Sequence, residues 1–170
     1  MKTILVVEDD VRMADHIAKS IGETDRYDAV VAHNGKEAFE VLDRHKRFLG
    51  LANNQIKCIV LDLKMPEMDG VQFITEFRQK EPFFKLMPVI ILTAYEDKEK
   101  WQATTGAQWG AAAAYLKKPF DRKELLDAID RVFKGEMGYM IDETREKSYE
   151  RLKKIEEEER FYGKGKRDTE

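Results

Sequence analysis

The sequence predicts an α/β fold in which a five-stranded parallel sheet is doubly wound, with an added charged helix at the C-terminal end. Three observations support this prediction. Short apolar runs alternate with amphipathic stretches, as they do in consecutive β–α units. Most of the runs are apolar at nearly every position, which is typical of strands buried on both faces. The final stretch of the chain, in contrast, is dense in Glu, Lys and Arg.

Five strands are expected, at Ile4–Val7, Ala29–Ala32, Ile56–Leu61, Val89–Leu92 and Ala113–Leu116. Helices are expected at Val11–Ile21, Lys36–Leu42, Val71–Arg78, within Lys98–Gln108, and at Arg122–Phe133. In the last of these, apolar residues recur at helical spacing and form a stripe that faces the sheet. Ligands of doubly wound sheets gather at the carboxyl ends of the strands, so a functional site is expected there.

Two parts of the chain differ in composition. We expect one folded domain over residues 1–134 and a charged helical extension over residues 135–170, whose end is disordered. Gly135 and Gly138 separate the two parts, and Asp142–Tyr162 contains acid–base pairs four residues apart that support a helix. The apolar seam of this helix is too short for a coiled coil. The extension is therefore either a solvated helix or a helix that binds a partner or a second copy.

Composition and charge exclude several classes of protein. The formal net charge is −3 with both signs mixed, so there is no basic field of the kind that binds nucleic acid or anionic membranes. No apolar stretch approaches the about 20 residues that span a bilayer. Cys58 is the only cysteine, which excludes an internal disulfide and fits a reducing compartment. We expect a cytoplasmic protein that contacts neither nucleic acid nor membrane directly.

Polar residues follow four of the expected strands. The first strand runs into Glu8-Asp9-Asp10, the third into Asp62, the fourth into Thr93 and the fifth into Lys117-Lys118. In a parallel sheet these ends meet at one edge, where the carboxylates would repel each other unless a divalent cation were shared. Oxygen ligands suit Mg²⁺. A carboxylate can attack phosphorus, while a metal and a lysine neutralise the phosphoryl oxygens, so phosphoryl transfer is the chemistry that this set favours.

Over roughly residues 2–134 the sequence resembles the receiver domain of bacterial response regulators. The similar segments are Ile4–Asp10, Ala32–Ala38, Leu61–Gly70 and Tyr115–Phe120. The resemblance implies a flavodoxin-like fold that takes a phosphoryl group from a histidine kinase or a phosphotransfer protein. It implies a signalling module that acts as an enzyme only in its own phosphorylation and dephosphorylation.

The resemblance also implies roles for individual residues, with Asp62 as the phosphoacceptor and Mg²⁺ as the cofactor. The implied metal ligands are Glu8, Asp9, Asp62 and the backbone carbonyl of Lys64. Thr93 and Lys118 would contact the phosphoryl group, and the Lys118–Pro119 bond would be cis. Thr93 and Tyr115 would form the switch. The switch would control binding of a downstream partner or formation of a homodimer. The surface involved would be the face of the fourth helix, fifth strand and fifth helix, or the C-terminal helix.

Several features depart from the family pattern. The segment Arg44–Gln55 is longer than usual, and so is the stretch from Thr93 to Lys118, which leaves the extent of the fourth helix open. Lys64 stands where many receivers carry a residue that orients the hydrolytic water. Because a lysine cannot accept a hydrogen bond, we expect slow self-dephosphorylation. A piece of a longer regulator is an open alternative to a regulator of one domain.

Two other functions are disfavoured. A phosphohydrolase with an aspartyl-phosphate intermediate usually has a second acid two residues after the nucleophile, where this chain has Lys64. A flavodoxin-like cofactor binder needs a glycine-rich phosphate cradle after the first strand, where this chain has three acids.

Some residues near these motifs are expected to have structural roles. Asp10 is expected to favour the start of a helix, and Asp69-Gly70 to form a turn. Met65 and Met68 are expected to pack under the loop after the third strand. The three histidines, His16, His33 and His45, show no ligand spacing and are expected on the surface or with satisfied hydrogen bonds.

Overall fold

The computed structural model describes residues 1–45, 56–80, 87–93, 113–136, 150 and 153. Its strands are β1 (Lys2–Val7), β2 (Tyr27–Ala32), β3 (Ile56–Asp62), β4 (Val89–Thr93) and β5 (Ala114–Lys117). Its helices are α1 (Val11–Gly22), α2 (Gly35–His45), α3 (Gly70–Lys80) and α5 (Arg122–Phe133).

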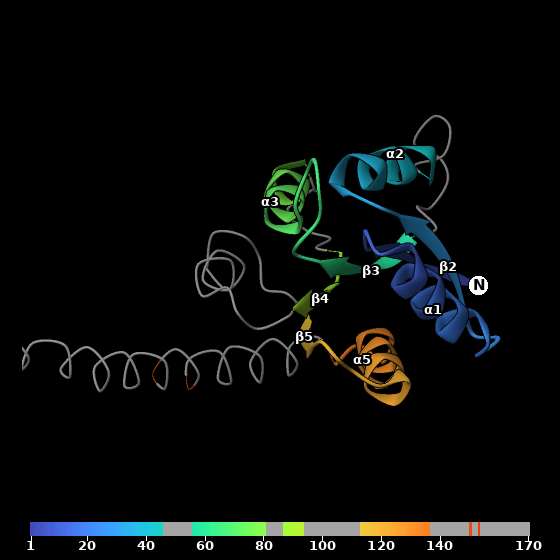
Figure 1. Ribbon diagram of the computed structural model, residues 1–170. Coiled ribbons are helices and arrows are strands. Elements are labelled where there is room, and N and C mark those ends of the chain that lie inside the picture. The colour runs from blue at the N-terminus through green and yellow to red at the C-terminus, as the bar shows by residue number, and fades with distance from the viewer. Residues whose placement is uncertain (46–55, 81–86, 94–112, 137–149, 151–152, 154–170) are drawn as a thin grey trace, which may run out of the picture.

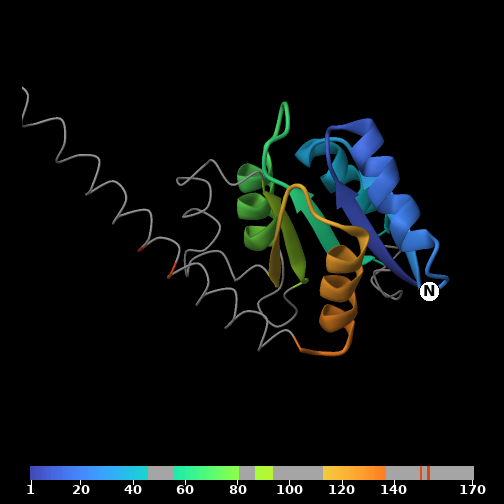
Figure 2. The ribbon, with the colours of Figure 1, turned by 60° about the horizontal axis from the view of Figure 1, so that its bottom comes forward.

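The five strands form one sheet in the order β2-β1-β3-β4-β5, and every neighbouring pair is parallel. Helices α1 and α5 cover one face, and α2 and α3 cover the other (Figure 1). Figure 2 shows β4 between α3 and α5 in a second view. The structure confirms the predicted doubly wound five-stranded parallel sheet.

Alternating side chains of the central strands supply two separate cores. Leu5 and Val7 of β1 face α2 and α3, together with Ile59 and Leu61 of β3. Their neighbours in the sequence face the core under α1 and α5. Strands in the middle of the sheet are thus buried on both faces, which is why their sequences show no polar alternation.

Element ends differ from the predictions at a few positions. Strand β2 begins at Tyr27 and not at Ala29, because Tyr27 and Asp28 continue the parallel register with Lys2 and Thr3. The exposed Asp28 interrupts the apolar run that the prediction used. Helix α2 continues to His45 because its last turn is polar and faces solvent for the most part, which an apolar pattern cannot report.

Some predictions concern residues outside the described part. These are the fourth helix within 98–108, most of the long segment 44–55, and almost all of the C-terminal extension. Glu150 and Lys153, the two residues after 136 that are described, are helical and exposed. Among the described residues, no helix combines the length and apolar character needed to cross a membrane.

Candidate functional site

The acids predicted to converge do lie together at the carboxyl edge of the sheet. Glu8 and Asp9 follow β1, and Asp62 is the last residue of β3. These two strands are neighbours, with Val7 opposite Leu61 in the register. Glu8 and Asp62, the residues that follow this pair, therefore lie next to each other at the carboxyl edge of the sheet.

One carboxylate oxygen from each of Glu8, Asp9 and Asp62 lies within 4.8 Å of the other two. Glu8 and Asp62 are buried, with 2% and 6% of their surface exposed, whereas Asp9 is exposed. Such a set offers three hard oxygen donors, one of which belongs to a residue exposed to solvent. A divalent cation that keeps several water ligands, as Mg²⁺ does, fits these donors.

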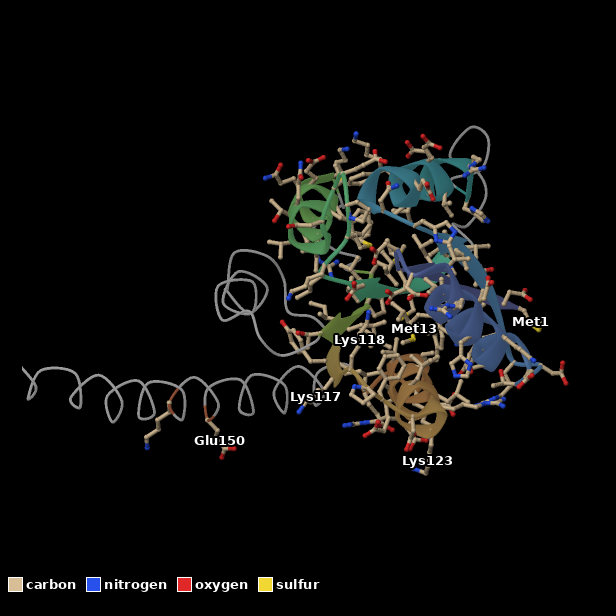
Figure 3. The ribbon with its side chains drawn as sticks, in the orientation of Figure 1. Met1, Met13, Lys117, Lys118, Lys123 and Glu150 are labelled. Atoms are coloured by element: carbon tan, nitrogen blue, oxygen red, sulfur yellow. The ribbon has the colours of Figure 1, made fainter. Side chains whose placement is uncertain are left out.

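Lys118 supplies the positive charge of the site. Its Nζ lies 2.6 Å from Oε2 of Glu8 and 3.1 Å from Oδ1 of Asp62. The Lys118–Pro119 bond is cis, as expected, and the amide of Lys118 donates to the carbonyl of Thr93 at 2.8 Å. In Figure 3, Lys118 lies within the body of the molecule, whereas the exposed Lys117 extends outward from β5.

The charges do not balance within the cluster. When all are ionised, three carboxylates and one ammonium leave a charge of −2 (−3 + 1), which equals the charge that one divalent cation neutralises. The oxygen donors and their net charge thus both favour a divalent cation.

Burial and neighbouring charges shift the pKa of these groups. Burial raises the pKa of Glu8 and of Asp62, and the hydrogen bond and charge of Lys118 only partly oppose this effect. Burial alone would lower the pKa of Lys118, but Glu8 and Asp62 outweigh it and raise that pKa. The ammonium is therefore held charged between two carboxyl groups whose ionised forms are disfavoured by burial.

The loop after β3 is held closely against the rest of the site. The amide of Gly70 donates to the carbonyl of Leu63 at 3.1 Å, and the amide of Gly35 donates to that of Met68 at 3.1 Å. Met65 and Met68 are buried in the core under α2 and α3, as predicted. The loop that follows Asp62 is thus closed by one hydrogen bond and tied to the start of α2 by another.

Two acids near the cluster begin helices, which was predicted for Asp10 but not for Asp69, for which a turn was expected. The carboxylate of Asp10 accepts from the amide of Met13 at 3.0 Å and caps α1. The carboxylate of Asp69 accepts from the amide of Gln72 at 2.9 Å, at the start of α3. These hydrogen bonds account for both side chains.

The remaining predicted site residues lie at or near the same edge. Thr93 ends β4 and is partly buried. Tyr115 pairs with Ile91 in the register and packs against the core under α2 and α3. The side chain of Lys64 is exposed in the loop after Asp62.

Two positions at the site were not recognised from the sequence as part of it. Gly70 was predicted as a turn residue, yet its α-carbon lies against the main chain of Asp62. The ring of His33, for which only a surface or satisfied role was expected, contacts the carbonyl of Glu8. The Asp69-Gly70 pair in the sequence could have indicated the close approach at Gly70. No spacing in the sequence links His33 to Glu8.

Comparison with known proteins shows which family has this sequence and this fold. The family model of the response regulator receiver domain matches residues 4–130. The chain belongs to this family. It is also 31% identical to the transcriptional regulatory protein SrrA of Staphylococcus aureus, over 83% of this chain and 52% of SrrA. The chain thus spans about half the length of the curated relatives it matches.

Solved structures of receiver domains resemble this one. The Vibrio cholerae chemotaxis protein CheY4 is 27% identical, with a TM-score of 0.63 over 78% of this chain and 98% of CheY4. The receiver domain of the Francisella response regulator 1452 is 28% identical, with a TM-score of 0.60 over 79% of this chain and 98% of that domain. The fold is thus of the CheY-like, flavodoxin-like type. The protein is a receiver domain of two-component signalling. Members of this family are signalling modules.

Proposed function

We propose that this receiver domain accepts a phosphoryl group on Asp62 from a histidine kinase or a phosphotransfer protein, in a reaction that depends on Mg²⁺. The observation that supports this most strongly is the buried Asp62 carboxylate, which contacts Lys118 and lies close to two further acids. A carboxylate at the open end of a strand can attack a donor from solution. The ammonium beside it can neutralise the oxygens of the incoming group.

Mg²⁺ would be held by the carboxylates of Glu8, Asp9 and Asp62 and by the backbone carbonyl of Lys64. When bound, it supplies positive charge that offsets the repulsion between these acids and the phosphoryl oxygens. Glu8 is fully buried and paired with Lys118, so we assign it a contact through water. We assign the exposed Asp9 a direct contact.

Asp62 would act as the nucleophile. One of its oxygens forms a bond to phosphorus while the bond from phosphorus to the donor's histidine nitrogen breaks, and the electron pair of that bond stays on the imidazole. Lys118 then pairs with the phosphoryl oxygens instead of the free carboxylate. Thr93, at the end of the neighbouring strand, donates its hydroxyl hydrogen to the same group.

The output would follow from Thr93 and Tyr115. As Thr93 moves towards the phosphoryl group it vacates space, and Tyr115 turns inward. This changes the face formed by the fourth helix, β5 and α5, which binds a downstream protein or a second copy. We further propose that residues 1–134 form the receiver domain and that residues 135–170 form a charged helical extension able to serve the same contact.

We expect one phosphoryl adduct when the protein is incubated with acetyl phosphate and Mg²⁺ and weighed intact by mass spectrometry. Removing the metal with a chelator should abolish the adduct, because the uncompensated acids repel the donor. Peptide mapping should place the adduct on Asp62. An adduct that forms equally well in chelator, or that maps elsewhere, would contradict the proposed chemistry.

We also expect the phosphorylated protein to lose its phosphoryl group slowly because of Lys64. Changing Lys64→Asn should shorten the lifetime about 3- to 10-fold, the effect of one hydrogen bond of about 1 kcal/mol to the attacking water. Lys64→Met removes the charge but offers no oxygen acceptor, so it is the matched control and should leave the lifetime unchanged. Equal lifetimes in wild type and Lys64→Asn would refute the explanation.

A further inference from the structure

A histidine ring supports the acidic cluster from the neighbouring strand end. Nδ1 of His33 lies 3.1 Å from the carbonyl oxygen of Glu8. His33 directly follows β2, which pairs with β1 in parallel, and Glu8 directly follows β1. The contact therefore joins the two chain segments just where they leave the sheet.

This contact fixes a peptide unit that is already held on its other side. The amide of Glu8 donates to the carbonyl of Ala32 at 3.1 Å, which continues the sheet by one residue. The carbonyl of Glu8 belongs to the next peptide bond, which leads into Asp9. Holding it limits rotation on both sides of that bond, including the φ angle of Asp9.

His33 is itself firmly positioned. Its amide donates to Oε2 of Glu37 at 2.8 Å. The amide of Glu37 donates in turn to Oδ1 of Asn34 at 2.9 Å, a reciprocal arrangement that resembles a capping box at the start of α2. The main chain of His33 is thus tied to a helix end, which fixes the position from which its ring reaches the carbonyl of Glu8.

The chemistry of the contact determines the state of the ring. A carbonyl oxygen can only accept a hydrogen bond, so Nδ1 of His33 must carry the hydrogen. In the neutral ring, Nε2 is then the unprotonated nitrogen. This is a definite tautomer, and it can be observed.

We propose that His33 is a positioning residue for the divalent-cation site: by donating to the carbonyl of Glu8, it fixes the main chain from which the Asp9 carboxylate projects. Glu8 and Asp62 are held by Lys118, whereas Asp9 is exposed and depends on its main chain for orientation. This inference rests on the proposed Mg²⁺ site.

The test is a titration with Mg²⁺ alone, followed through backbone amide signals by NMR in wild type, three His33 variants and one control variant. His33→Ala removes the donor and should weaken Mg²⁺ binding about 3- to 10-fold, which corresponds to one hydrogen bond. His33→Asn carries an amide nitrogen at the same number of bonds from the backbone as Nδ1, so it should bind within about twofold of wild type. His33→Gln places that nitrogen one bond further and should bind as weakly as His33→Ala.

His16→Ala is the matched control, because it removes an exposed histidine from α1 and should leave Mg²⁺ binding unchanged. Nitrogen NMR of wild type at alkaline pH should show His33 with its hydrogen on Nδ1. A hydrogen on Nε2 would overturn the inference, as would binding in His33→Gln equal to that in His33→Asn. The comparison of Asn with Gln decides the matter even if His33→Ala does not fold.

The failure of this inference differs from that of the proposed function. If wild type binds no Mg²⁺ at millimolar concentration, the proposed metal site is wrong and the role of His33 falls with it. If wild type binds Mg²⁺ and all three His33 variants bind it equally well, only the role of His33 is wrong.

Discussion

An Asp62→Asn variant incubated with acetyl phosphate and Mg²⁺ is expected to gain no phosphoryl mass under conditions in which wild type is fully modified. The change keeps the shape of a buried side chain and removes the nucleophilic carboxylate. An amide is a far weaker nucleophile towards phosphorus, so the expected loss is complete within the sensitivity of intact mass spectrometry.

The matched control is Asp69→Asn in the same loop. The carboxylate of Asp69 accepts from the amide of Gln72 and begins α3. Asparagine caps a helix as well as aspartate does, so this variant should fold and become phosphorylated like wild type. An adduct on Asp62→Asn, or its loss in Asp69→Asn, would show that another residue accepts the group.

Unfolding of Asp62→Asn provides the folding control. Because burial raises the pKa of Asp62 above its ordinary value, the ionised carboxylate costs folding free energy at neutral pH. That cost should disappear as the pH falls from the raised pKa through the ordinary range of a carboxyl group. The neutral amide avoids the cost, so the variant should unfold at a temperature no lower than wild type at neutral pH.

A Gly70→Ala variant is expected to lose about 2–4 kcal/mol of unfolding free energy. A β-carbon at this position would lie 2.2 Å from the carbonyl oxygen of Asp62 and 2.8 Å from the α-carbon of Leu63. Both are main-chain atoms, so no side chain can rotate away to relieve the overlap. Urea denaturation measures the loss, and the remaining folded protein should also be phosphorylated more slowly because Asp62 is displaced.

Gly22→Ala is the control for the glycine itself. Gly22 is the last residue of α1, and a β-carbon there would meet no atom within 4 Å. Alanine is the better helix former, so this variant should be as stable as wild type or slightly more stable. If Gly70→Ala were as stable as Gly22→Ala, the close approach of α3 to Asp62 would not require a glycine at position 70, and the prediction would be wrong.

Much of the fold follows from local patterns in the sequence. The apolar runs at Ile4–Val7, Ile56–Leu61 and Val89–Leu92 can be buried on both faces only in a sheet covered by helices. Their ends were predictable because the charged or polar residues that follow them are costly to bury without a partner. For the same reason the acids after the first and third strands could be assigned to one edge of the sheet.

The site was predictable as a set of residues but not as a geometry. A sequence pattern places Glu8, Asp62 and Lys118 at strand ends, yet it does not say that Lys118 contacts both acids. That contact depends on the order β2-β1-β3-β4-β5, which brings together residues far apart in the sequence. The cis bond before Pro119 was expected only from the family resemblance.

By itself the sequence determined the α/β class, the residues at the strand ends and the chemistry that their charges favour. The tertiary structure alone decided which of these groups touch, that His33 supports the main chain of Glu8, and that the α-carbon of Gly70 lies against the strand end of Asp62. The physical reason is the range of the interactions. Burial and helical spacing act between near neighbours in the sequence, whereas hydrogen bonds and steric contacts between strand ends exist only once the sheet is assembled.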